Sequence, residues 1–182
     1  VGAADDVTLG AGTDVAAGQE LILAAGTDAG DAVTMAATST ATAGTDMILR
    51  GRSVSADALE AGMDIDVLGA DEGVVLNDTV RSITGDINVA TTNGDLVVDG
   101  AVTANDGAVS LEGGGANGID INEAVLADDN IDLTASVLTV DNTVTSANGS
   151  IEAIVQNGME VNADMTAAAD LRAAAGDIDI DA

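Results

Sequence analysis

Carboxylates are the side chains in this sequence that could do chemistry. The chain carries 32 Asp and Glu residues against four basic residues, all of them arginine, and it has no histidine, lysine, cysteine or aromatic residue. Paired carboxylates can act as general acid and general base, as in glycoside hydrolysis. They occur so densely here that their presence does not predict catalysis, and polysaccharide-cleaving sites usually add histidine, lysine or aromatic sugar platforms. We therefore predict no catalytic residues and no enzyme, with a carbohydrate-active enzyme (polysaccharide lyase or hydrolase) as the alternative.

Calcium binding is the other chemistry that dense carboxylates allow. Asp71 and Glu72 with Asp78 form one group of oxygen donors, and Asp128 and Asp129 with Asn130 form a second. Calcium takes about six to eight oxygen ligands at defined positions. The sequence contains no EF-hand loop and no Gly-Gly-x-Gly-x-Asp array. These residues are candidate calcium ligands in a calcium-stabilised module, and diffuse counterion screening is the alternative.

The charge and the absence of certain segments limit the partners. A net charge of -28 repels nucleic acid and anionic lipid, so neither is an expected partner. Without cysteine there is no disulfide framework and no zinc–thiolate site. The chain begins without a basic signal-peptide region, and no apolar run reaches transmembrane length. We interpret the sequence as a mature product or an interior piece of a longer protein, without membrane insertion.

The core must be built from aliphatic side chains, because the sequence has no Phe, Trp or Tyr. Small and medium aliphatic residues suit a narrow core made of many similar layers better than one wide core. An acidic chain could instead be disordered, but its content of Val, Ile and Leu is too high for that class. The order of these residues along the chain also argues against disorder.

Short runs of alternating apolar and polar residues recur along the chain and leave no room for helices. Alternation with period two predicts strands with one buried face. From Ile65 onward, three interleaved ladders of apolar residues can be traced, and all three share one nearly constant period. The first ladder is Ile65, Ile87, Val109, Ile131, Ile151 and Leu171. The second is Val74, Leu96, Ile119, Leu138, Met159 and Ile178, and the third is Val80, Val102, Val125, Val144 and Met165.

The pattern around each ladder favours a parallel β-helix. The residue after each first-ladder position is polar in every coil, and the residue two positions on is apolar, so the chain returns to the interior with period two. Three ladders with a common period predict a three-sided coil, with one parallel sheet per side and strands about 4.8 Å apart. The predicted fold is all-β, a three-sided parallel β-helix (β-solenoid) of about eight or nine coils with ~20–22 residues each.

Glycines mark the expected corners between strands. Asn and Gly tolerate the positive φ that sharp turns need, so we expect positive φ at these positions. The expected corner positions are the Asn-Gly pairs 93–94, 117–118, 148–149 and 157–158, and the single glycines Gly85, Gly107 and Gly176, which precede strands.

The segment 1–64 follows the repeat less regularly than the rest of the chain. Val7, Leu21, Val33 and Met47 head similar runs, but these runs stand only 12 to 14 residues apart, closer together than the members of any one later ladder. No linker or shift in composition separates this part from the rest. We interpret residues 1–182 as one solenoid domain, with irregular coils at 1–64 and regular coils at 65–182.

A family resemblance follows from the strand motif. The pattern Gly-Asp-Ile-x-Val occurs at Gly85–Val89, and related runs stand at Gly94–Val98, Asn148–Ala153 and Gly176–Ile180. It resembles the shaft repeats of filamentous haemagglutinin-like adhesins, the large two-partner-secretion exoproteins of Gram-negative bacteria. The secretion domain of that family is not visible here. The resemblance implies a right-handed β-helix, export through a partner pore, and a location at the cell surface or in the extracellular (biofilm) matrix.

The ends of the predicted rod suggest its partners. Terminal coils of a solenoid expose unpaired strand edges, which natural solenoids cover with atypical caps. No cap is recognisable, and Asp177–Ile180 forms a good strand close to the last residue. The expected partners are therefore neighbouring coils of a longer shaft, or a second copy that stacks end to end into a filament. The predicted function is a structural or adhesive shaft.

Overall fold

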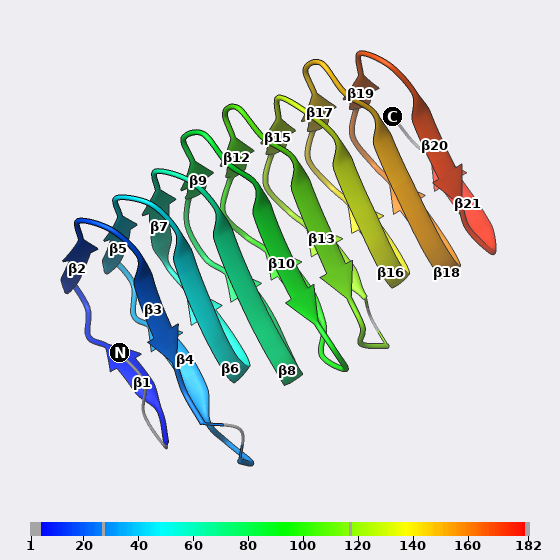
Figure 1. The fold of residues 1–182 in the computed structure, drawn as a ribbon. Coiled ribbons are helices and arrows are strands. Elements are labelled where there is room, and N and C mark those ends of the chain that lie inside the picture. Colours follow the sequence, from blue (N-terminus) through cyan, green and yellow to red (C-terminus); the bar gives the residue numbers. More distant parts are fainter. Residues whose placement is uncertain (1–4, 27, 117, 181–182) are drawn as a thin grey trace.

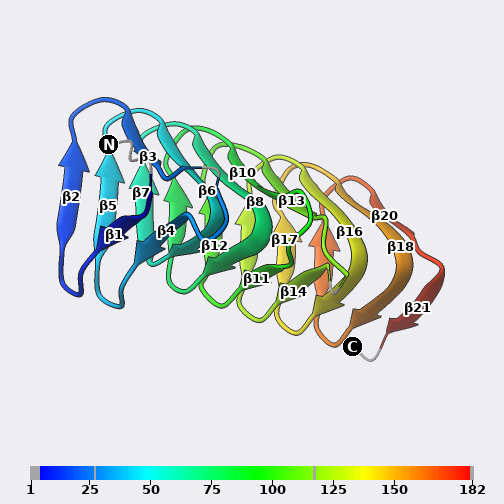
Figure 2. The ribbon, with the colours of Figure 1, turned by 90° about the horizontal axis from the view of Figure 1, so that it is seen from below.

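The computed structural model describes residues 5–26, 28–116 and 118–180, which form a rod of stacked coils (Figure 1). Each coil passes through three faces, and strands of successive coils pair in parallel along each face (Figure 2). Within the described residues, no helical segment has the length and apolarity needed to span a bilayer. The all-β parallel solenoid predicted from the sequence is confirmed.

The strands fall on three faces, which correspond to the three ladders. The first face contains β3 (Leu21–Ala24), β6 (Met47–Ala56), β8 (Ile65–Leu76), β10 (Ile87–Thr91), β13 (Val109–Gly113), β16 (Ile131–Val140), β18 (Ile151–Val161) and β20 (Leu171–Ala174). The second face contains β1 (Val7–Leu9), β4 (Ala32–Met35), β11 (Leu96–Val98), β14 (Ile119–Ile121), β21 (Asp177–Ile180) and the second halves of β6, β8, β16 and β18. The third face contains β2 (Asp14–Ala17), β5 (Thr40–Ala43), β7 (Ala58–Ala61), β9 (Val80–Ser82), β12 (Val102–Ala104), β15 (Val125–Ala127), β17 (Val144–Ser146) and β19 (Met165–Ala167).

The register of all three ladders matches the prediction residue by residue. On the first face, Ile65 pairs with Ile87, Ile87 with Val109, and the ladder continues in the predicted order to Leu171. The second ladder runs in register from Val74 to Ile178, and the third from Val80 to Met165. Register is strongly specified because a slip of one residue would turn every apolar side chain outward.

The prediction of one sheet per face is wrong, because the first and second faces share one sheet. The described strands form a sheet of 13 strands and a separate sheet of eight, the third face. Strands β6, β8, β16 and β18 run through the corner between the first two faces without ending, at 10 to 12 residues each. In the two coils between them, the chain leaves the sheet at this corner, so β10 and β11 are separate strands, as are β13 and β14.

The rod has slightly fewer turns than the eight or nine predicted. The eight strands of the third face give about seven turns. Part of the difference lies in the first coil, where Val7 pairs with Val33 and Leu21 with Met47, because this coil is longer than any of the regular ones. The next step, from Met47 to Ile65, is shorter than any of them. The irregular spacing seen in the sequence therefore arises because Val7, Leu21, Val33 and Met47 alternate between two faces.

The core is a column of aliphatic side chains that follows the rod axis. From Ile65 to Val161 the inward residues of the first two faces are at most 5% exposed. On the third face the second inward position is small in every coil, as in Ser82, Ala104 and Ser146, and these residues are buried. Full burial of an Ile or Leu side chain stabilises by about 1.5–3 kcal/mol, so many similar layers replace one aromatic core.

The corner glycines are required mainly for close packing, and the expected positive φ is wrong for most of them. Among the described glycines, positive φ occurs at Gly12, Gly30, Gly73 and Gly118, so only the last belongs to the predicted corner set. A Cβ at Gly94 would lie 2.0 Å from the backbone nitrogen of Gly73 in the neighbouring coil. Successive coils thus approach too closely for any side chain at such a position. Asn117 of the pair 117–118 lies outside the described residues.

Candidate functional site

The acidic side chains form columns along the corners of the rod, and one column explains the Gly-Asp-Ile motif. In five coils, the residue directly before the first-face strand accepts a hydrogen bond from the backbone N–H one coil further along, whereas Ala108 before β13 has no acceptor in its side chain. Asp64 Oδ1 accepts from Asp86 N at 2.9 Å, and Asp86 Oδ1 accepts from Ala108 N at 2.8 Å. A Cβ at Gly85 would lie 2.2 Å from Asp64 Oδ1, so the glycine makes room for this carboxylate. The motif therefore has a structural role in joining coils.

Polar substitutes continue this column. Asn130 Oδ1 accepts from Ser150 N at 2.8 Å, and Ser150 Oγ accepts from Asp170 N at 3.3 Å. Any short side chain with an acceptor oxygen can fill the position, because what it satisfies is a backbone donor at the corner. The sequence signal for the column was the Asp, Asn or Ser that stands before five of the six first-ladder residues, with Ala108 before Val109 as the exception.

A second arrangement pairs five of the aspartates with an asparagine amide one coil away. The amide Nδ2 donates to a carboxylate Oδ1 in every case, at 2.6 to 3.1 Å. Hydrogen bonds to an ionised acceptor are the stronger kind, and the amide separates carboxylates that would otherwise repel. The pairs are Asn88–Asp66, Asn93–Asp71, Asn122–Asp99, Asn148–Asp128 and Asn162–Asp141.

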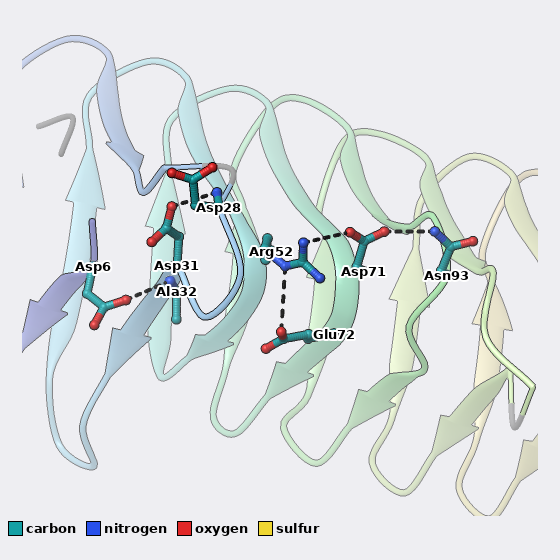
Figure 3. A network of polar contacts seen from close by, with 8 residues as sticks. All are labelled: Asp6, Asp28, Asp31, Ala32, Arg52, Asp71, Glu72 and Asn93. Atoms are coloured by element: carbon teal, nitrogen blue, oxygen red, sulfur yellow. Dashed lines mark hydrogen bonds and ion pairs between the residues drawn. The ribbon is translucent and has the colours of Figure 1, made fainter. Parts of the chain in front are cut away.

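The first candidate calcium group is occupied by an arginine of the chain itself. Arg52 Nη1 lies 3.2 Å from Asp71 Oδ2, and Arg52 Nε lies 3.5 Å from Glu72 Oε1 (Figure 3). Asn93 Nδ2 donates to the other oxygen of Asp71 at 2.7 Å. Arg52 Nε is buried and has no hydrogen-bond partner, so the guanidinium depends on these ion pairs. Sequence reasoning missed Arg52, although it stands about one coil before the two acids.

The remaining candidates lie at other corners and have local partners. Asp78 follows β8, and its Oδ1 accepts from the backbone N–H of Thr79 at 2.6 Å. Asp128 accepts from Asn148, while the carbonyl oxygen of Asp129 accepts from the Ser146 hydroxyl at 2.6 Å. In the part of the chain that the structure describes, no three side chains of the types that ligate metals form a group.

Two other arginines also lie beside acids. Arg81 Nη1 is 3.4 Å from Glu60 Oε2 across one coil step on the third face. Arg172 pairs in register with Glu152, as the ladder predicts, but its ion pair is with Asp170 at 2.9 Å. Exposed pairs of this kind contribute little to stability, about 0–1 kcal/mol.

One outward carboxylate has a perturbed environment. Burial raises the pKa of Asp120 on β14, and the carboxylates of Asp141 and Asp99 on the adjacent coils raise it further. The hydrogen bond with Asn122 acts in the opposite direction. Asp120 follows the outward valines Val75 and Val97 in one column of the second face, where each side chain is half-buried. This column therefore shields its carboxylate from water more than an open corner does.

The C-terminal coil ends in an open apolar surface. Leu171 is 52% exposed and Ile178 43% exposed, although the corresponding residues one coil earlier, Ile151 and Met159, are buried. Leu171 and Ile178 line a hollow of about 220 Å³ together with Met159, Val161, Met165 and Ala173. Among residues 5–26, 28–116 and 118–180, strands β19, β20 and β21 pair on one side only, with β17 and β18. The end of the rod thus offers both unpaired backbone and uncovered core residues.

Comparisons with protein-family models, with curated proteins and with solved structures found no match. The structure therefore defines the class of protein by its fold alone. It is a parallel β-solenoid whose corners carry aspartates that accept hydrogen bonds from asparagine side chains.

Proposed function

We propose that the chain is a segment of a secreted structural or adhesive shaft of the filamentous haemagglutinin-like kind, at the surface or in the extracellular matrix of a Gram-negative bacterium. The observation that supports this best is the unbroken set of parallel ladders that ends in an open, apolar coil at β19–β21. A rod of this kind gains length with each coil and needs no wide core.

The distribution of polar groups agrees with a scaffold role. Carboxylates are used along the rod to accept backbone N–H groups, to bind amides and to pair with arginines. A hydrolytic site needs two carboxylates that flank a bound sugar, with one of them held as an acid. A structural role uses the acidic surface for solubility and for repulsion between neighbouring rods.

The open end is proposed to bind either further coils of the same shaft or a second copy. Both would bury Leu171 and Ile178 and extend the ladders by the same backbone hydrogen bonds. A second copy meets one obstacle, because β1 and β21 both lie on the second face. If β2 of one copy paired with β19 of another, β4 would have to pair with β21, but β1 already occupies that side of β4. Further coils of the same shaft meet no such conflict, because the next strand of the chain would lie on the third face and pair with β19.

Analytical ultracentrifugation tests self-stacking. A variant without residues 1–13, which lacks β1, is expected to assemble more readily than the full chain as salt or divalent cations screen its charge. Leu171→Asp in the same shortened chain is the control, because a charge on the open end would prevent stacking. Purely monomeric behaviour of the shortened chain at every ionic strength would contradict the filament version.

A further inference from the structure

The described part of the chain contains three complete Asn-Gly pairs in different surroundings, and this dipeptide can rearrange chemically. The glycine nitrogen attacks the asparagine Cγ, the Cγ–Nδ2 bond breaks and ammonia leaves. Water then opens the cyclic imide to aspartate or to isoaspartate, whose main chain contains one additional carbon. The sum is asparagine plus water giving aspartate or isoaspartate plus ammonia. The reaction needs a glycine nitrogen that can reach Cγ, so local structure controls its rate.

Two of the pairs are restrained. Asn93 Nδ2 donates to the Asp71 carboxylate at 2.7 Å, and Gly94 packs so closely on Gly73 that a Cβ would lie 2.0 Å from its nitrogen. Asn148 Nδ2 donates to the Asp128 carboxylate at 2.6 Å. The nitrogen of Gly149 donates to Ser146 Oγ at 3.0 Å, which removes it from attack. Both asparagines are thus held by an ionised acceptor, and both glycines are tightly held.

The pair Asn157–Gly158 lies at an irregularity of β18. Val155 pairs with Ala135 and Gly158 with Val137, so Gln156 and Asn157 both lie opposite Ser136. On the other side of β18 the ladder stops at Ile154 and resumes at Gly158. Such a bulge leaves the extra residue outside the ladder. The backbone around Asn157 therefore has fewer ladder restraints than a regular strand.

The side chains at this pair are also less restrained. Asn157 is exposed, and its Nδ2 donates at 2.9 Å to the neutral hydroxyl of Ser136, a weaker acceptor than a carboxylate. A Cβ at Gly158 would meet nothing within 4 Å, so this glycine is not packed against a neighbouring coil as Gly94 and Gly149 are.

We propose that Asn157–Gly158 is a site of spontaneous deamidation in the folded protein, with water as the co-reactant. The isoaspartate product lengthens the backbone of β18 between its pairings with β16 and β21. Because Gly158 pairs with Asp177, the extra carbon shifts the register of the last second-face strand and loosens the terminal coil. This inference concerns the stability of the open end and does not depend on the proposed shaft function.

The test is incubation of the folded chain in mildly alkaline buffer made with water enriched in the heavy oxygen isotope, followed by peptide mapping by mass spectrometry. Opening of the cyclic imide introduces one labelled oxygen at each asparagine that reacts. Asn157 is expected to incorporate the label at least about tenfold faster than Asn93 and Asn148. In short peptides of the same three sequences the rates should be similar, which shows that the fold creates the difference. Equal rates in the folded chain, or faster reaction at Asn93 or Asn148, would overturn the proposal.

The matched variant is Gly158→Ala, since the open space at Gly158 accommodates a methyl group. It should suppress labelling of Asn157 and leave labelling at the other two pairs and the melting curve unchanged. Hydrogen exchange of residues 171–180 should rise as isoaspartate accumulates in the parent chain and stay constant in the variant. Undiminished labelling of Asn157 in a folded Gly158→Ala variant would also reject the mechanism.

Discussion

The coils before Ile65 and the coils after it use the same three faces but different corners. The later coils keep a nearly constant length, whereas the coil from Val7 to Val33 is longer and the coil from Met47 to Ile65 is shorter. The early corners contain the positive φ values at Gly12, Gly30 and Thr38. They also bury polar groups, such as Ser39 N, which donates to the Asp57 carboxylate at 3.0 Å. Corners thus absorb differences in coil length while the faces keep their register.

A core substitution tests whether stability is concentrated in the regular coils. Leu111 is fully buried on β13, so Leu111→Ala should lower the free energy of unfolding by about 2–5 kcal/mol. Leu171→Ala, on the open last coil where the side chain is 52% exposed, should lower it by less than about 1 kcal/mol. Urea denaturation measures both. Equal losses would mean that the last coil is covered in solution.

Corner glycines give the second comparison. A Cβ at Gly107 in the regular coils would lie 2.2 Å from the carbonyl oxygen of Gly85, so Gly107→Ala should cost about 1–3 kcal/mol. At Gly18, among the early coils, a Cβ would meet nothing within 4 Å, and Gly18→Ala should change stability by at most about 0.5 kcal/mol. Thermal melting measures both variants. Equal melting midpoints for Gly107→Ala and Gly18→Ala would refute the close-packing account.

Arg52 links the two regions, because it reaches from β6 to the acids of β8. In the parent chain it supplies the positive charge next to Asp71 and Glu72. Arg52→Gln should lower stability by only about 1 kcal/mol without calcium, since partly exposed ion pairs are weak. Added calcium should then raise the melting temperature of the variant more than that of the parent. The same response in both chains would show that calcium acts elsewhere or only by screening.

The smallest expected effect concerns pH. The pKa of Asp120 is raised in the folded state by burial and by Asp141 and Asp99, so the charged form costs stability at neutral pH. As pH falls through the raised pKa toward the ordinary value of 3.8, the folded state takes up the proton first and that cost disappears. Asp120→Asn should therefore stabilise by up to about 0.5 kcal/mol at neutral pH and less in acid. Asp132→Asn, on the exposed first face, controls for the lost charge.

The ladders could be predicted from sequence because inward residues are large aliphatics at a nearly constant coil period, as in Ile65, Ile87 and Val109. The early third-face strands β2 and β5 were missed, since their sequences Asp-Val-Ala-Ala and Thr-Ala-Thr-Ala carry little apolar contrast. The merging of two faces was also missed, because it depends on whether a corner keeps its backbone pairing. Arg52 escaped notice because unequal steps hide which residues are neighbours across coils.

A tandem chain tests the central claim, that the open end accepts continuing coils. Residues 10–180 placed directly after residue 180 would follow β21 with a third-face strand in the correct order. Small-angle X-ray scattering should show one rod whose length rises from about 40 Å to about 80 Å at constant cross-section. Scattering from two separate short rods joined by a flexible hinge would contradict the account of this chain as a shaft segment.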